Sequence, residues 1–260
     1  MNYHEELEFA CRIAAVAGEN ARRIRAHGVS AETKPDASPV TIADKENERL
    51  IREAIEQKFP ADGILGEEGS SKAGSSGRRW IIDPIDGTRD FVRGNRFWCV
   101  LLALEEADES LVGVAHFPML GESYWASLGG GAYAGTPGGG ERLRVSAASA
   151  LGESVFSPEG LHLAAARPHL PRVMDLMQRC WAVRSYGGAL DACLLAAGKA
   201  EIWFEPKVEV WDLAPLKLII EEAGGAFFAL DGSRSIAKGT AIGCAPGVAE
   251  EVRKWFGISD

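Results

Sequence analysis

Apolar residues recur about every 3.6 positions in the first segment of the chain, which predicts an amphipathic helix that ends at Gly28. The members of this stripe are Leu7, Cys11, Ile13, Ala14 and Ala17. A second helix is expected to begin at Thr41, whose spacing to Asp44 is that of a capping box. Its inner face consists of Leu50, Ile51, Ala54 and Ile55. The residues between the helices, 29–41, contain two prolines and predict a short strand pair or an extended loop.

Apolar stretches of strand length follow these helices. They are GILG at 63–66, RWIID at 79–83, and the segments 97–106, 111–117 and 122–128. Short turns join the last three, which predicts an antiparallel meander. A flexible polar loop is expected at 69–77 and a glycine-rich hairpin with its own small strand at 129–142.

From about residue 150 the pattern changes to alternating helices and strands. We expect helices at 169–180, 187–197, 212–223 and 247–256, and strands at 181–185 and 201–204. This order predicts a layered α/β fold in which sheets lie between helix pairs. We expect a single catalytic domain over residues 1–260, with an N-terminal half of about 1–150 and a C-terminal half of about 151–260.

Composition and charge narrow the classes of function. A formal charge of −9 with no basic stripe to offset it argues against a nucleic-acid partner. No apolar run is long enough for a membrane span, and the N-terminal residues are unlike a signal peptide. The five cysteines form no CxxC pair, so we expect free thiols in a reducing, cytoplasmic compartment.

Isolated acidic residues lie at the edges of apolar segments. They are Glu67, Glu68, Asp83, Asp86 and Asp212. Asp83 and Asp86, three residues apart across a proline-kinked turn, can converge on one point, and the Ile85 carbonyl between them can add a neutral ligand. Oxygen ligands suit hard cations such as Mg²⁺, and crowded carboxylates need cations or raised pKa values. The histidines are scattered, which argues against a zinc site.

The Gly87-Thr88 pair that follows Asp86 adds an anion site. If a helix or tight turn begins there, its free amides favour a phosphate. Metal ions next to that phosphate would activate water as the nucleophile and stabilise the leaving alkoxide. The sequence contains no GxSxG motif for a serine nucleophile.

Structural explanations exist for each acid taken singly. Asp83 with Pro84 is a common start of a turn, and Asp212 is a suitable N-cap for the helix after it. Asp44 can simply close its capping box, and Glu67 with Glu68 can be a solvated loop. Their coincidence in one chain favours a common site.

Three segments resemble the signature of the inositol monophosphatase family. They are GEE at 66–68, WIIDPIDGTRDF at 80–91 and WDLAPLKLIIEEAGG at 211–225. The family consists of Mg²⁺-dependent, lithium-sensitive phosphomonoesterases with a five-layer αβαβα fold, and its members are commonly dimeric. The resemblance spans nearly the whole chain and implies this fold, a homodimer and about two to three Mg²⁺ ions in each active site.

The resemblance also implies roles for particular residues. The implied metal ligands are Glu67, Asp83, the carbonyl of Ile85, Asp86 and Asp212. Asp44 and Thr88 match the pair that orients and activates the attacking water, and Glu68 matches the acid near a third metal ion. The residues that match substrate-binding positions are Asp86, Gly87, Thr88, Gly188, Ala189 and Glu205.

The alcohol half of the substrate is expected to be that of L-histidinol phosphate. Arg93-Gly94 followed by Trp98 resembles the histidinol-phosphatase branch of the family. That branch has an acid where this chain has Gly188, so Glu205 or Asp191 would have to bind the substrate's amine. The alternatives are inositol 1-phosphate as the substrate, or a non-catalytic metal or phosphate sensor on the same fold.

Overall fold

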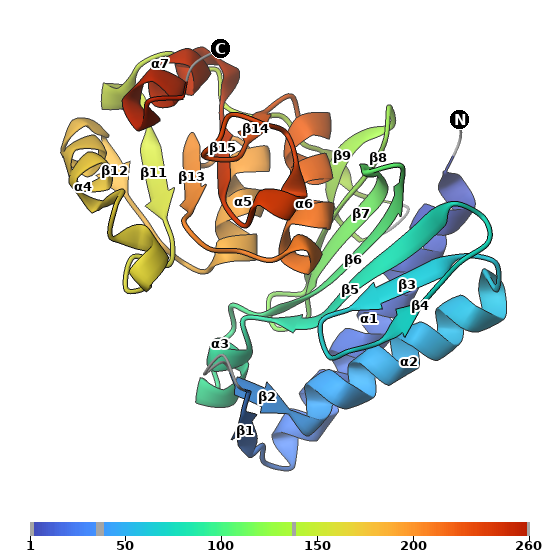
Figure 1. Cartoon of the computed structure of the whole chain (residues 1–260). Coiled ribbons are helices and arrows are strands. Elements are labelled where there is room, and N and C mark those ends of the chain that lie inside the picture. The colour runs from blue at the N-terminus through green and yellow to red at the C-terminus, as the bar shows by residue number, and fades with distance from the viewer. Residues whose placement is uncertain (1–2, 35–38, 137–138, 259–260) are drawn as a thin grey trace.

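The computed structural model describes residues 3–34, 39–136 and 139–258. Helices α1 (His4–Ala26) and α2 (Ile42–Lys58) pack side by side near the N-terminus (Figure 1). Thr41 and Asp44 form the predicted capping box at the start of α2. Strands β1 (Ala31–Thr33) and β2 (Pro39–Thr41) pair antiparallel between the helices, which confirms the predicted strand pair; residues 35–38 of that segment lie outside the described residues.

The larger sheet has eight strands in the order β10-β9-β8-β7-β6-β5-β3-β4. In chain order these strands are β3 (Gly63–Gly66), β4 (Ser71–Lys72), β5 (Arg78–Asp86), β6 (Cys99–Glu106), β7 (Glu109–Phe117), β8 (Glu122–Ser127), β9 (Gly131–Gly135) and β10 (Glu141–Arg142). The antiparallel run β6-β7-β8 is the predicted meander, and β9 with β10 forms the predicted hairpin. The segment 69–77 is not only a loop, because β4 within it pairs with β3.

The smaller sheet has five strands in the order β12-β11-β13-β15-β14. They are β11 (Val155–Pro158), β12 (Ala182–Val183), β13 (Ile202–Glu205), β14 (Ala226–Phe228) and β15 (Ala241–Cys244). The prediction omitted β11, β14 and β15. Each has three or four residues and little apolar–polar alternation, so the sequence pattern carries no strand signal there.

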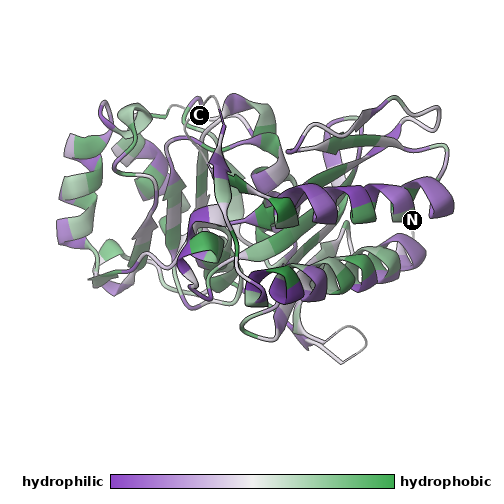
Figure 2. Cartoon of the chain, turned by 90° about the horizontal axis from the view of Figure 1, so that it is seen from below, coloured by the Kyte–Doolittle hydropathy of each residue, from purple (hydrophilic) through white to green (hydrophobic). Residues whose placement is uncertain are grey.

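Helices and sheets alternate in five layers, which confirms the αβαβα architecture (Figure 1). Helices α1 and α2 cover the outer face of the larger sheet, and α5 (Gly188–Ala196) and α6 (Val210–Glu222) lie between the two sheets. Helices α4 (Leu170–Arg179) and α7 (Pro246–Phe256) cover the outer face of the smaller sheet. Short helical turns complete the chain: α3 (Thr88–Arg93), η1 (Leu151–Glu153), η2 (Ala164–Ala166) and η3 (Ile236–Lys238). Hydropathy colouring places mostly hydrophobic residues in the strands between the helices (Figure 2).

Several large aromatic residues are interior. Trp98, Phe117 and Trp125 are buried, so they do not form an exposed dimer surface. The five cysteines are free thiols, as predicted, and four of them are buried. Among the described residues no helix is long and apolar enough to cross a membrane.

Candidate active site

Two aspartates of strand β5, Asp83 and Asp86, lie at the same edge of the larger sheet. Asp83 pairs with Leu101 of β6 and Asp86 pairs with Cys99, so β5 holds one extra residue between them. This is a β-bulge inside a continuous strand and not the proline-kinked turn that the sequence suggested. Pro84 is tolerated because a bulge leaves one residue out of the ladder. The bulge bends the strand and turns both carboxylates toward one point.

Asp212, at the start of α6, joins these two residues in an aspartate cluster. One carboxylate oxygen from each of Asp83, Asp86 and Asp212 lies within 4.8 Å of the others. Burial is the main reason that the pKa of Asp86 rises to about 7 and that of Asp212 to about 6. Burial, followed by the charges of Glu67, Asp212 and Asp86, raises the pKa of Asp83 far above its usual range. The cluster therefore resists full ionisation unless a cation lies between its carboxylates.

Two of the predicted site residues also cap helices. Asp212 is the third residue of α6, and its Oδ2 accepts a hydrogen bond from the Glu209 amide at 3.0 Å. Asp44 holds the same position in α2, where its Oδ2 accepts from the Thr41 amide at 2.8 Å and the Thr41 hydroxyl at 2.6 Å. Capping and site roles therefore coexist, because the cap fixes one carboxylate oxygen and leaves the other directed at the site.

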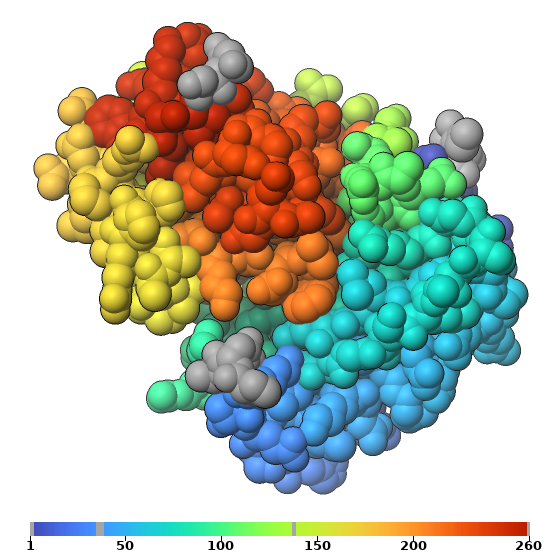
Figure 3. Space-filling model, viewed as in Figure 1, coloured from blue at the N-terminus to red at the C-terminus, as the bar shows by residue number. Residues whose placement is uncertain are grey.

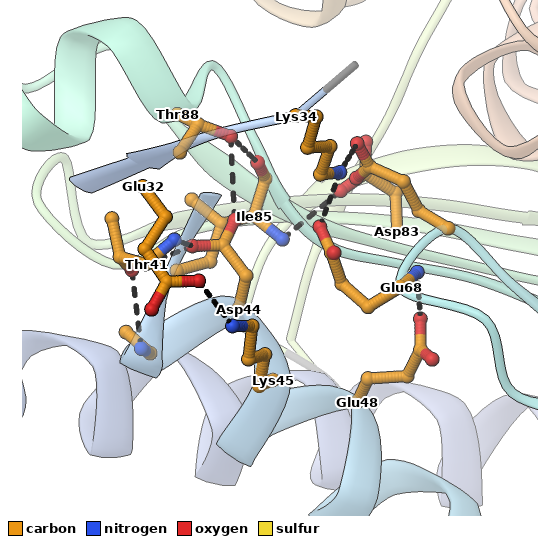
Figure 4. A network of polar contacts seen from close by, with 12 residues as sticks. Glu32, Lys34, Thr41, Asp44, Lys45, Glu48, Glu68, Asp83, Ile85 and Thr88 are labelled. Carbon is orange, nitrogen blue, oxygen red and sulfur yellow. Dashed lines mark hydrogen bonds and ion pairs between the residues drawn. The ribbon is translucent and has the colours of Figure 1, made fainter. Parts of the chain in front are cut away.

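Asp44 and Thr88 lie together beside the β5 bulge (Figure 4). The Thr88 Oγ1 is 3.3 Å from Asp44 Oδ1 and 3.1 Å from the Ile85 carbonyl oxygen. A hydroxyl has one proton, so it can donate to one of these acceptors and accept from a third group. Burial is the main cause of the raised pKa of Asp44. The pair can thus take up a proton from a molecule bound between them and the aspartate cluster.

Gly87 joins the bulge to the short helix α3. It has φ +81°, and a Cβ there would be 2.9 Å from the Phe97 carbonyl oxygen, so a larger residue would force the backbone apart. The first amides of α3 have no partner within the helix. Gly87 and Thr88 therefore present backbone donors at the edge of the cluster, in agreement with the sequence-based expectation of a helix or tight turn.

Glu67 and Glu68 follow β3, and the carboxyl group of Glu67 contacts that of Asp83. Both accept hydrogen bonds from Lys34, at 2.8 Å for Glu67 Oε1 and 2.6 Å for Glu68 Oε1 (Figure 4). The carboxylate of Glu48, on α2, accepts from the Glu68 amide at 2.6 Å and the Ser70 amide at 2.8 Å. Lys34 and Glu48 were not among the predicted site residues. The sequence offered only the helix position of Glu48 and no signal for Lys34.

The other three residues predicted to bind the substrate come from α5 and β13 and form a second wall of the site. Gly188 and Ala189 begin α5, and Glu205 ends β13. A Cβ added to Gly188 would lie 2.6 Å from Glu205 Oε1, so the Glu205 carboxylate occupies the space that a side chain at 188 would need. Glu159, which sequence reasoning missed, lies beside this group because β11 and β13 are parallel neighbours. Figure 3 shows the surface hollowed between the orange residues of this wall and the blue residues of the β1–β2 region.

Comparisons with known proteins agree with this geometry. A model of the inositol monophosphatase family matches residues 2–254. The histidinol-phosphatase of Mycobacterium tuberculosis is 41% identical over 242 residues, which cover 92% of this chain and 93% of that protein. The inositol-1-monophosphatase of Rhizobium meliloti is 37% identical over 196 residues, covering 74% of this chain and 72% of that protein. The crystal structure of extragenic suppressor protein suhB from Bartonella henselae matches with a TM-score of 0.90 at 27% identity, covering 97% of this chain and 98% of that one.

Proposed function

This chain belongs to the inositol monophosphatase family, and on that premise we propose that it is a Mg²⁺-dependent phosphomonoesterase whose substrate is L-histidinol phosphate. The observation that carries the proposal is the aspartate cluster, whose oxygens lie within 4.8 Å of one another next to Asp44 and Thr88. Members of the family act on small phosphate monoesters.

The donor set suits a hard divalent cation. The proposed ligands are carboxylate and carbonyl oxygens only: Glu67, Asp83, the Ile85 carbonyl, Asp86 and Asp212. Three carboxylates so close together repel one another, and cations remove that penalty. Mg²⁺, when bound there, supplies positive charge that acidifies water and neutralises a phosphate. Lys34 provides part of that charge for Glu67 and Glu68 in the metal-free protein.

The residues of the chain would accept a proton, orient the attacking water and bind the substrate. Asp44 accepts the proton of the attacking water, and Thr88 orients that water by accepting or donating a hydrogen bond. The amides of Gly87 and Thr88 hold the phosphate oxygens. Glu68, next to Glu67, is the acid near a third metal ion. Gly188, Ala189 and Glu205 contact the alcohol half of the ester.

The choice of L-histidinol phosphate is supported by the relatives and by charge. The histidinol-phosphatase relative is more similar over more of the chain than the inositol-1-monophosphatase relative. The wall that faces the alcohol half carries carboxylates, which suit an ammonium group. Inositol 1-phosphate is the second candidate because of the 37% identical relative.

The test is release of phosphate from L-histidinol phosphate by protein treated with a chelator and then supplied with Mg²⁺. We expect no release without Mg²⁺ and turnover after its addition. Asp175→Asn, an exposed residue of α4 in a helix ion pair, is the control and should match the wild type. Binding of Mg²⁺ and phosphate without turnover of any ester would instead identify a sensor.

The proposal extends to the assembly: a single catalytic domain that forms a homodimer, and no nucleic-acid partner. Trp181 and Tyr186 are exposed and line one surface pocket with Phe97, which gives an apolar surface for a second copy. Sedimentation at micromolar concentration should give the mass of a dimer, and a monomer would contradict this part.

A further inference from the structure

Helix α3, which carries Thr88, depends on contacts outside itself. It has six residues, too few for a helix that is stable on its own in water. Of these six residues, all of them described, only Phe91 is buried. Gly87 and Gly94 flank the helix with left-handed φ values of +81° and +82°, and a glycine has no side chain that could anchor the backbone. The position of the Thr88 hydroxyl therefore depends on what holds Phe91 and the residues after it.

A small apolar cluster connects α3 with the β5 bulge. Its buried members are Ala21 of α1, Ala43 of α2, Ile85 of the bulge, Phe91 of α3 and Trp98. The rings of Phe91 and Trp98 meet edge to face, with their centroids 4.9 Å apart. The carbonyl oxygen of Ile85 lies 3.1 Å from Thr88 Oγ1. Packing in this cluster therefore decides where Thr88 lies relative to the bulge.

Arg25, in the last turn of α1, contacts both rings of this cluster. Its guanidinium group lies 5.6 Å from the ring centroid of Phe91 and 5.5 Å from that of Trp98. Its Nη1 donates a hydrogen bond to the Asn95 carbonyl at 2.7 Å. Asn95 bonds back to Asp90 of α3, from its amide to the carbonyl at 2.9 Å and from Nδ2 to Oδ1 at 2.5 Å. One side chain of α1 thus holds α3 and the segment that follows it.

A separate set of contacts fixes α1 relative to the bulge. Asn20 Nδ2 donates to Asn47 Oδ1 at 3.0 Å, and Asn47 Nδ2 donates to the Pro84 carbonyl at 3.4 Å. Asn47 is fully buried on α2, and Pro84 lies in the bulge itself. Arg25 therefore extends from a helix that is already bonded to the bulge, so its contacts set the distance between the bulge and α3.

We propose that Arg25 is a positioning residue for the phosphatase reaction: it holds α3 against the β5 bulge and so fixes the Thr88 hydroxyl beside Asp44. The proposal rests on the proposed function, in which Thr88 orients the attacking water. Arg25→Met keeps an apolar stem but removes the planar cation and the donor to Asn95. Arg25→Lys keeps a charge and a donor but not the planar group that lies over two rings.

Hydrogen–deuterium exchange tests the Arg25 contacts without turnover. The amides of Phe91, Gly94 and Asn95 donate to the carbonyls of residues 87, 91 and 90, so their exchange reports the opening of α3. We expect Arg25→Met to raise these exchange rates at least about tenfold and Arg25→Lys to raise them less. Thermal unfolding checks that both variants fold.

Arg12→Met is the matched control. Arg12 lies on the same helix with its guanidinium group 5.9 Å from the ring centroid of Phe9, which belongs to a different apolar cluster. This variant loses the same kind of contact away from the site. It should leave both the exchange in α3 and the kinetics unchanged.

Kinetics on L-histidinol phosphate at saturating Mg²⁺ test the positioning itself. Arg25→Met should lower kcat about tenfold with KM within about threefold of the wild type, since Thr88 acts on the attacking water. The Mg²⁺ concentration for half-maximal thermal stabilisation should also stay within about threefold, because the proposed metal ligands lie outside α3. In a Thr88→Ala background, Arg25→Met should lower kcat at most about twofold, because the hydroxyl that it positions is gone.

Unchanged exchange in Arg25→Met would overturn the proposal whatever the activity. A loss of kcat that persists at about tenfold in Thr88→Ala would also overturn it, because Arg25 would then act through another group. A lower unfolding midpoint with unchanged kcat would leave Arg25 only a structural role and overturn the proposal as well. If the wild type hydrolysed no ester, the phosphatase proposal would fail, and the exchange rates would still decide whether Arg25 holds α3.

Discussion

Asp83→Asn removes one charge from the aspartate cluster and preserves the shape of the side chain. The asparagine oxygen can still accept the hydrogen bond that Asp83 Oδ1 receives from the Ile85 amide at 3.0 Å. At an effective dielectric of about 20, two unit charges 4.8 Å apart repel by about 3.5 kcal/mol. The metal-free variant should therefore be more stable than the metal-free wild type, with an unfolding midpoint up to about 7 °C higher at about 2 °C for each kcal/mol.

The same substitution removes a ligand that the proposed metal site requires. We expect Mg²⁺ to raise the unfolding midpoint of the wild type and to leave that of Asp83→Asn almost unchanged, since a ligand stabilises only a fold that binds it. Phosphate release should fall by about 1,000-fold, which corresponds to about 4 kcal/mol of transition-state stabilisation. A thermal-shift assay measures the unfolding midpoint and a phosphate-release assay measures turnover, both on the same protein preparation.

The opposite pattern would refute the reasoning. If metal-free Asp83→Asn were less stable than the wild type while its response to Mg²⁺ was intact, Asp83 would have a structural role and would not be a metal ligand. The gain in metal-free stability should also be largest at high pH, where more of the cluster is ionised. Asp175→Asn, which removes a charge from an exposed helix ion pair, should change neither the midpoint nor the Mg²⁺ response appreciably.

Three further predictions concern charge around the site. Lys34→Met removes the ammonium group shared by Glu67 and Glu68, so it should lower metal-free stability and tighten Mg²⁺ binding in a thermal titration; weaker Mg²⁺ binding would contradict it. The folded-state pKa values of about 7 for Asp86 and about 6 for Asp212 exceed the ordinary value of 3.8, so the folded protein binds the extra protons. Metal-free stability should therefore fall as the pH rises from about 4 to about 7, and chemical denaturation that shows it rising would be inconsistent with these shifts. Gly188→Ala should displace the Glu205 carboxylate and lower kcat/KM for L-histidinol phosphate about tenfold with little loss of stability, whereas unaltered kinetics would count against the assigned position of Glu205.

The sequence predicted the elements that carry a strong local signal. Helical periodicity located α1 and α2, and the spacing of Thr41 and Asp44 predicted the cap that the structure contains. The β-bulge was not predictable because Asp83-Pro84 also suits a turn, and pairing with β6 decides between the two. Strands β14 and β15 are short and buried, so tertiary contacts rather than local patterns specify them.

The same distinction explains which site residues sequence reasoning found. Asp83, Asp86 and Asp212 lie within recognisable motifs, and the structure brings them together. Lys34 and Glu159 follow from no motif, because each becomes part of the site only when distant segments pack. Lys34 and Glu67 are 33 positions apart in the sequence, and Glu159 contacts Asp191 in the first turn of α5. Such residues become visible only after the fold is known.

The most direct test of the proposed function is a comparison of L-histidinol phosphate and myo-inositol 1-phosphate as substrates of the same enzyme at saturating Mg²⁺. The account predicts Mg²⁺-dependent phosphate release with kcat/KM at least about 100-fold higher for L-histidinol phosphate, equivalent to about 2.7 kcal/mol of differential transition-state binding. Equal values, or a preference for the inositol ester, would contradict the assigned substrate.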